Sequence, residues 1–213
     1  MNVENEQKVQ KRRIDWKSIL VIFILLAILG AGWSFRSLNN NWDESRHLHP
    51  DERYLSMVVN MIEPVWTARE YFDTTASPLN PANKDFSFFV YGTLPLFMLR
   101  YAGEWTGQTG YDLNTLLGRT MSAAMDTLTI LLIFLTAKKL FNRWIGLIAA
   151  ALYAFAVLPI QLAHYMTVDS FTNTFAMLTV LIAAEILMRK PLSAEEESGK
   201  VIRIWRSEER RVG

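Results

Sequence analysis

Residues 18–35 read SILVIFILLAILGAGWSF, and no charged side chain interrupts this stretch before Arg36. Its length suits one helical crossing of a hydrocarbon core about 30 Å thick. Five basic residues precede it and favour a cytoplasmic N-terminus at 1–17: Lys8, Lys11, Arg12, Arg13 and Lys17. A cleaved signal peptide is the alternative. Because the apolar region of a signal peptide is usually shorter and Gly30-Ala31-Gly32 is a poor cleavage site, we predict an uncleaved anchor.

The composition favours a polytopic membrane protein over a soluble domain on a tether. Hydrophobic residues make up 51% of the chain, the net charge is only +1, and most charges gather near the ends and in segment 36–114. No basic face with interleaved aromatic residues appears outside the segments that orientation explains, so nucleic acid is not an expected partner. The chain has no cysteine, which excludes disulfides, thiolate nucleophiles and cysteine-ligated metals.

The number of membrane crossings decides on which side each polar residue lies. Four apolar stretches follow the first, at 86–102, 115–137, 144–163 and 170–188. The stretch 86–102 contains a glycine and a proline, and its apolar part is too short for a crossing, so we place it in the outer interface. The loop 138–143, KKLFNR, is basic and belongs in the cytoplasm. It would lie outside if all five stretches crossed, and we therefore predict four crossings.

The predicted fold is an all-α integral membrane fold with about four transmembrane helices and a cytoplasmic tail at 189–213. The segments 36–114 and 164–169 are then outer loops of a multi-pass cell-membrane protein. Within the first of them, DERYLSMVVNMI at 51–62 has apolar residues at helical spacing. This pattern predicts a short amphipathic helix on the membrane surface.

Three carboxylates meet on one side under this topology. Asp51 and Glu52 follow His49-Pro50 early in the first outer loop, and Asp169 lies in the second. The positive end of a helix favours ionised carboxylates, and an ionised carboxylate can act as a base. We therefore take all three as candidate catalytic residues. The alternatives are ordinary first-turn acids for Asp51 and Glu52 and a helix N-cap for Asp169.

Two ionisable residues lie in or near the crossing at 115–137. Arg119 and Asp126 are seven residues apart and share one helix face. Ionisable groups at such depth are costly and prompt a functional hypothesis. Arg119 is a candidate contact for a lipid phosphate, with snorkelling to the headgroups as the alternative. Asp126 is expected to pair with a basic group on a neighbouring helix.

Further candidates for substrate contact lie in the outer loops. Lys84 precedes the predicted interfacial helix and can contact phosphate, although a solvated loop lysine is the alternative. His164 lies five residues before Asp169 and is a candidate for substrate contact or metal ligation, with loop hydrogen bonding as the alternative. No cofactor is certain. A divalent cation stays open, and Asp51 and Asp169 are the residues we expect to hold it if it binds.

These motifs resemble a known family in their order along residues 18–190. They are the N-terminal anchor, the Asp-Glu pair, YGTLPLF at 91–97 and GRTMSAAMDTLTILLIFLTAKKLFNRWIGLIAAALYAFAVLPIQLAHYMTVDSF at 118–171. The chain resembles membrane glycosyltransferases with the GT-C fold, and more narrowly the family 39 group of protein O-mannosyltransferases and lipid A aminoarabinose transferases. Some relatives carry a Glu-Lys-Pro element where this chain has Lys84-Asp85-Phe86, so their metal and phosphate contacts at that point do not carry over directly.

The resemblance implies transfer of a sugar from a polyprenyl-phosphate carrier to an acceptor on the outer face. It implies that Asp51 is the general base with Glu52 beside it, that Asp169 helps to build the site, and that Arg119 is the basic residue of the GR-x-x-S pattern. The acceptor is a protein, lipid or glycan hydroxyl. Direct displacement inverts the anomeric centre, so one base suffices and no protein nucleophile is needed.

Two other functions stay open at this stage. One is a transporter with Arg119, Asp126 and Asp169 in its pathway, and the other is a membrane scaffold without catalytic activity. Relatives of this group are usually longer, and residues 206–213 resemble translated adapter sequence. We therefore expect an N-terminal fragment whose activity belongs to the complete protein.

Overall fold

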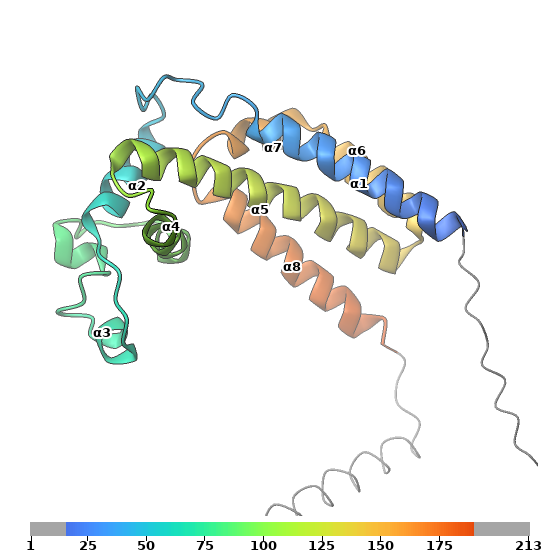
Figure 1. Ribbon diagram of the computed structural model, residues 1–213. Helices are drawn as coiled ribbons and strands as arrows, with labels where there is room; N and C mark the ends of the chain where they lie inside the picture. The colour runs from blue at the N-terminus through green and yellow to red at the C-terminus, as the bar shows by residue number, and fades with distance from the viewer. Residues whose placement is uncertain (1–15, 190–213) are drawn as a thin grey trace, which may run out of the picture.

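The computed structural model describes residues 16–189, and in this part of the chain every regular element is a helix (Figure 1). The elements are α1 (Trp16–Ser37), α2 (Pro50–Met61), α3 (Ala68–Phe72), the 3₁₀ helix η1 (Pro81–Lys84), α4 (Thr93–Thr106), α5 (Tyr111–Leu140), α6 (Arg143–Ala154), α7 (Val157–Ala163) and α8 (Asp169–Leu187). The predicted all-α fold is confirmed. Most of the predicted N-terminus, 1–17, and of the predicted tail, 189–213, lies outside the described residues.

Three of these helices, α1, α5 and α8, are long and apolar enough to cross a membrane. The pair α6 and α7 passes the same test as a unit, although the two helices meet at a bend of 60°. The described chain thus has three candidate spans, or four if the bent pair counts as one. This range includes the predicted number, and the protein is a multi-pass membrane protein.

The predicted crossing at 144–163 is not one straight helix, because the helix breaks between Ala154 and Val157. Pro159 explains the break. A proline in a continuous helix has no N–H to donate, and its ring would clash with the carbonyl four residues earlier, here that of Phe155. Helix α6 ends at Ala154, and α7 begins at Val157, two residues before the proline. Pro159 therefore lies in the first turn of α7, where the missing N–H costs nothing.

Helix α5 is the central element and is longer than the predicted 115–137. Its 30 residues span about 45 Å, more than the hydrocarbon core. Arg36, at the end of α1, contacts Asp126 near the middle of α5, so the first half of α5 projects beyond α1. We call this end of the bundle, with residues 38–110 and 164–168, the loop end. The opposite end, with residues 138–143, is the basic end.

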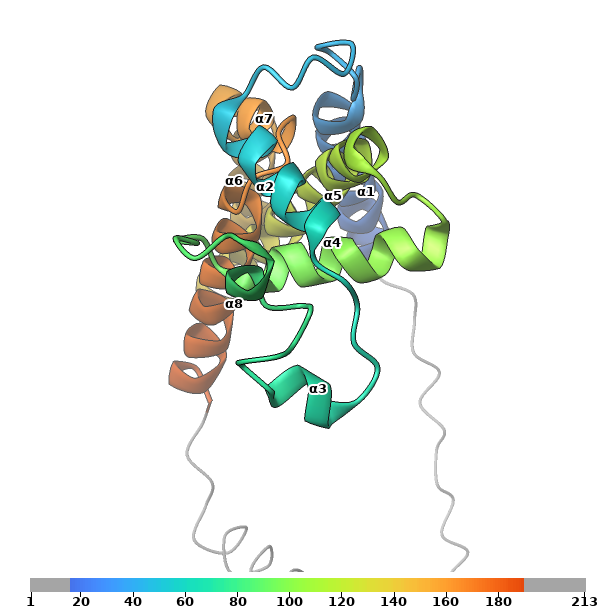
Figure 2. The ribbon, with the colours of Figure 1, turned by 90° about the vertical axis from the view of Figure 1, so that its left-hand side faces the viewer.

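The long segment between α1 and α5 folds onto the projecting half of α5. Helices α2 and α4 pack against it, and α4 runs across the bundle (Figure 2). The predicted interfacial helix at 86–102 is wrong at its start, because α4 begins only at Thr93. Gly92 is its N-cap, and Pro95 lies in its first turn, where proline is tolerated. A buried apolar cluster joins these helices: Leu55, Val58, Val59, Ile62, Val65, Leu79, Leu96, Leu99 and Met166.

A buried ion pair joins α1, α5 and α6. Arg36 Nε donates to Asp126 Oδ2 at 2.5 Å, and Tyr153 donates its hydroxyl to Asp126 Oδ1 at 2.7 Å. Arg36 also donates to the carbonyl oxygens of Ala154 and Gly32 at 2.9 and 3.1 Å. Both charged side chains are 1% exposed. Asp126 pairs with a basic group on a neighbouring helix, as expected, and the closed pair favours a structural joint over a transport pathway.

Gly118 tests how tightly the loop end is packed. A Cβ on this residue would lie 2.9 Å from Met166 Cβ, an atom close to the backbone that has little room to move. We expect Gly118→Ala to lower the free energy of unfolding by about 1–3 kcal/mol, measured by denaturation in detergent micelles. Gly30→Ala is the matched control, since nothing lies within 4 Å of its added Cβ. Equal stability of the two variants would contradict the packing described for Met166.

Candidate functional site

Arg119 is the centre of a closed polar cluster at the loop end. Its Nε and Nη2 atoms donate to the two carboxylate oxygens of Glu52 at 2.8 and 2.6 Å. Its Nη1 and Nη2 atoms donate to the two oxygens of Asp43 at 3.0 and 2.9 Å, and Nη1 also donates to the carbonyl of Asn40 at 2.9 Å. The five N–H groups of the guanidinium are therefore all used. The indole of Trp42 lies 5.3 Å from the guanidinium carbon.

Two predicted site residues are corrected by this geometry. Glu52 is 0% exposed and Arg119 is 1% exposed, so neither reaches solvent or headgroups. Snorkelling of Arg119 is excluded by its burial, and a lipid phosphate would find no free N–H on it. Glu52 is held by Arg119 and by the backbone N–H of Met166, 2.7 Å from Oε1. Both residues position the loop end, because they join α2, α5 and the segment before α8.

The same cluster gives a pH dependence with a definite sign. Hydrogen bonds from Arg119, opposed by burial, hold the pKa of the Asp43 carboxyl at about 2, against an ordinary 3.8. Ionised Asp43 therefore contributes stability that is complete above about pH 4 and is lost as the pH falls towards 2. The loss amounts to about 2 kcal/mol.

Thermal unfolding in micelles checks this expectation. The unfolding temperature of the wild type should fall between pH 4 and pH 2, and Asp43→Asn should flatten that part of the curve. Wild-type and variant curves that stay parallel through this range would contradict the role assigned to Asp43.

Asp51 differs from its neighbour Glu52 in being exposed. It lies in the first turn of α2, after Pro50, and the His49 side chain caps the helix by accepting the N–H of Glu52 at 3.3 Å. The carboxylate lines an open groove of about 440 Å³ on the loop end. The other lining residues come from α2 and from the segment before α4: Tyr54, Asp85, Phe86, Ser87, Phe88, Val90 and Tyr91. An exposed carboxylate therefore faces a cavity with four aromatic side chains.

Asp169 lies at the same end of the bundle as Asp51, although the two residues are far apart in the sequence. It is the first residue of α8 and is exposed, and Val168 is the N-cap, so the N-cap interpretation of Asp169 is wrong. The segment before it is attached to α2, because Met166 donates its N–H to Glu52 and the rings of His49 and Tyr165 lie 4.3 Å apart.

Tyr91 lies within the influence of both candidate acids. Burial raises the pKa of its phenol, and the Asp51 carboxylate raises it further, with a smaller effect from Asp169. Tyr91 therefore keeps its proton and acts as a hydrogen-bond donor at neutral pH. The structure brings Asp51 and Asp169 to one end of the molecule, with Tyr91 near both.

Lys84 and His164 lie outside this groove. Lys84 Nζ pairs with Glu63 Oε1 at 2.6 Å. His164 places Nδ1 2.7 Å from the carbonyl of Ile160 and Nε2 3.1 Å from the carbonyl of Leu38. A ring nitrogen that faces a carbonyl offers no lone pair to a metal, so this arrangement contradicts the metal-ligand interpretation of His164 and favours the hydrogen-bonding alternative.

The residues present do not form a ready metal centre. Within residues 16–189 no group of three or more histidine or acidic side chains converges on one point. Asp51 and Asp169 are the two carboxylates that stay as candidate ligands for a divalent cation. Two carboxylates are a small set for a cation held by protein oxygens, and the mechanism proposed below uses no metal.

Three residues of these clusters were not identified as site or partner residues from the sequence. Arg36 ends the first apolar run, Asp43 lies in a polar loop, and Tyr91 is the first residue of the YGTLPLF motif. The signal for Arg36 was Asp126, since a carboxylate at that depth requires a partner. No sequence signal marks Asp43, because its partner Arg119 is distant in the chain.

A comparison with known protein families matches the second part of the chain, which contains Arg119 and Asp169. Residues 105–194 match the family model described as dolichyl-phosphate-mannose-protein mannosyltransferase. The match supports a GT-C, family 39-like glycosyltransferase and covers the second part of the chain. The search of curated proteins and the search of solved structures each give no match. The matched segment contains Arg119 and Asp169, whereas Asp51 lies before it.

Proposed function

We propose that this protein is a membrane glycosyltransferase that moves a sugar from a polyprenyl-phosphate carrier to an acceptor hydroxyl on the outer face of the membrane, with inversion and with Asp51 as the general base. One observation carries the assignment. Asp51 is an exposed carboxylate that lines a groove of about 440 Å³ at the end of the bundle where Asp169 also lies. The family match supports the reaction class, because mannosyltransferases of this kind are named for a lipid-phosphate sugar donor.

The proposed step balances with one base. The acceptor oxygen attacks the anomeric carbon, and the bond between that carbon and the phosphate oxygen breaks. The acceptor proton passes to Asp51, and the polyprenyl phosphate leaves with the bonding electrons. A positioned base contributes about 10²–10⁴-fold to such a proton transfer. Because the phosphate is a competent leaving group, the enzyme needs no covalent intermediate.

The surrounding side chains suit the binding of a sugar next to Asp51. Tyr54, Phe86 and Phe88 line the groove and present aromatic rings, and Tyr91 keeps its phenolic proton near Asp51. In this scheme Asp169, at the same end of the bundle, accepts a hydrogen bond from a sugar or acceptor hydroxyl. Glu52 and Arg119 hold the start of α2 and do not touch the substrate in this scheme.

A donor comparison tests the proposal. The full chain is reconstituted in liposomes with a mixture of hydroxyl-bearing acceptors and a labelled sugar, supplied either on polyprenyl phosphate or on a nucleotide. We expect transfer from the polyprenyl-phosphate donor only, with inversion at the anomeric carbon. Transfer from the nucleotide donor, retention of configuration, or uptake of the sugar into liposomes without any transfer would overturn the proposal.

A further inference from the structure

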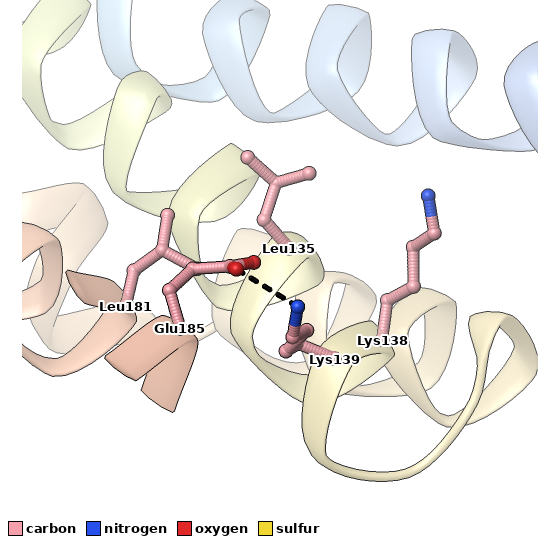
Figure 3. A pocket seen from close by; sticks show the side chains of 5 residues that line it. All are labelled: Leu135, Lys138, Lys139, Leu181 and Glu185. Atoms are coloured by element: carbon pink, nitrogen blue, oxygen red, sulfur yellow. Dashed lines mark hydrogen bonds and ion pairs between the residues drawn. The ribbon is translucent and has the colours of Figure 1, made fainter. Parts of the chain in front are cut away.

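The basic end carries a second groove, far from the candidate catalytic site. It lies between α5 and α8, has a volume of about 420 Å³, and is lined by five residues (Figure 3): Leu135, Lys138, Lys139, Leu181 and Glu185. We propose that this groove binds the headgroup of an anionic phospholipid from the leaflet at the basic end.

The charges of the groove favour an anion. Lys139 Nζ pairs with Glu185 Oε2 at 2.8 Å, and these two charges compensate each other. Lys138 extends away from that pair (Figure 3), and its ammonium lies 5.8 Å from the centre of the Phe134 ring. Within the described residues Lys138 has no carboxylate partner. The groove therefore carries one uncompensated positive charge.

The surroundings add to this positive potential. The basic side chains at this end, within residues 16–189, are Lys17, Lys138, Lys139, Arg143 and Arg189. Glu185 is the one acidic residue among the described residues at that end. Basic residues near a membrane surface attract anionic lipids, each contributing about 1 kcal/mol, and basic pockets between transmembrane helices bind lipid headgroups.

The apolar part of the groove suits the lipid chains. Leu135 and Leu181 lie one helical turn further from the end than the charged residues. Leu178 and Ile182 on α8 are exposed and continue the apolar surface along the helix. A phospholipid with its phosphate at Lys138 would direct its acyl chains along this surface, whereas a soluble anion would leave it uncovered.

Native mass spectrometry of the full chain in micelles tests the proposal with phosphatidylglycerol and phosphatidylcholine as probes. We expect preferential binding of phosphatidylglycerol, weakened about fivefold by Lys138→Gln. Glu185→Gln should strengthen that binding because it releases Lys139, so the two variants move in opposite directions. Arg46→Gln, which removes an exposed charge at the loop end, is the matched control and should bind as the wild type does.

Several results would overturn the proposal. They are equal binding of the two lipids, unchanged binding by Lys138→Gln in a protein of wild-type unfolding temperature, and equal weakening by Arg46→Gln. Polyprenyl phosphate is added as a third probe. Tighter binding of this lipid than of phosphatidylglycerol, abolished by Lys138→Gln, would also overturn the proposal, because a carrier lipid would then occupy the groove.

Discussion

Replacing Arg119 with methionine is expected to lower the free energy of unfolding by about 3–5 kcal/mol, because the variant leaves Asp43 and Glu52 buried without their cation. Both carboxylates are at most 4% exposed, and Arg119 bonds both oxygens of each. Lysine should not restore the loss, since an ammonium is a compact charge and cannot form two bidentate pairs. The measurement is denaturant unfolding in micelles.

The backbone at the loop end adds to this expectation. Four residues between α1 and α2 adopt left-handed backbone conformations that residues other than glycine rarely take: Asn39, Glu44, Ser45 and His47. Such conformations persist only where the surroundings enforce them. Arg119 enforces them here by bonding Asn40 and Asp43 within the same segment.

Two further variants separate loss of the cation from loss of packing. Arg46→Met removes an exposed arginine from the same end and should change stability little. The triple variant Asp43→Asn, Glu52→Gln, Arg119→Met removes the uncompensated charges and should recover part of the lost stability. If Arg119→Met alone has the same free energy of unfolding as Arg46→Met, the buried cluster does not hold the loop end together.

Asp51→Asn is expected to lower the initial rate of sugar transfer by about 10²–10⁴-fold with little change in stability. Asparagine preserves the shape and the hydrogen-bonding reach of the side chain but cannot take the acceptor proton. The carboxylate is exposed and has no ion-pair partner among the described residues, so its loss leaves no buried charge behind. The assay is label transfer from polyprenyl-phosphate sugar by the full chain in liposomes.

Neighbouring variants make this result specific. Glu44→Gln removes another exposed carboxylate of the loop end and should transfer at the wild-type rate. Glu52→Gln should lower the unfolding temperature, whereas Asp51→Asn should not, although the two residues are adjacent. Undiminished transfer by Asp51→Asn would remove the proposed base.

The crossings and the ends at which the loops lie were predictable because both follow from local composition. An apolar run of sufficient length must be helical in a bilayer, since no other arrangement satisfies its backbone groups there. The break between α6 and α7 was missed, although Pro159 is visible in the sequence. Hydropathy averages over a window and does not register where one missing N–H ends a helix.

The separation of Asp51 from Glu52 was not predictable. Both are acids in the first turn of one helix, and sequence patterns treat them alike. Successive residues on a helix point in directions about 100° apart, so one side chain turns inward to Arg119 and the other turns to the groove. Which of the two turns inward depends on how α2 packs on α5 and α4.

By itself the sequence determined the helical membrane class, the two ends of the bundle and the presence of acids at one of them. These properties depend on hydrophobicity and charge summed over neighbouring residues. Only the tertiary structure decided that the guanidinium of Arg119 bonds Asp43 and Glu52 and has no free N–H. It also decided that Arg36 is the partner of Asp126 and that Asp51 is exposed to solvent. Those outcomes depend on contacts between residues far apart in the chain. A buried charged group destabilises the fold strongly unless it has a partner, so burial requires these pairs.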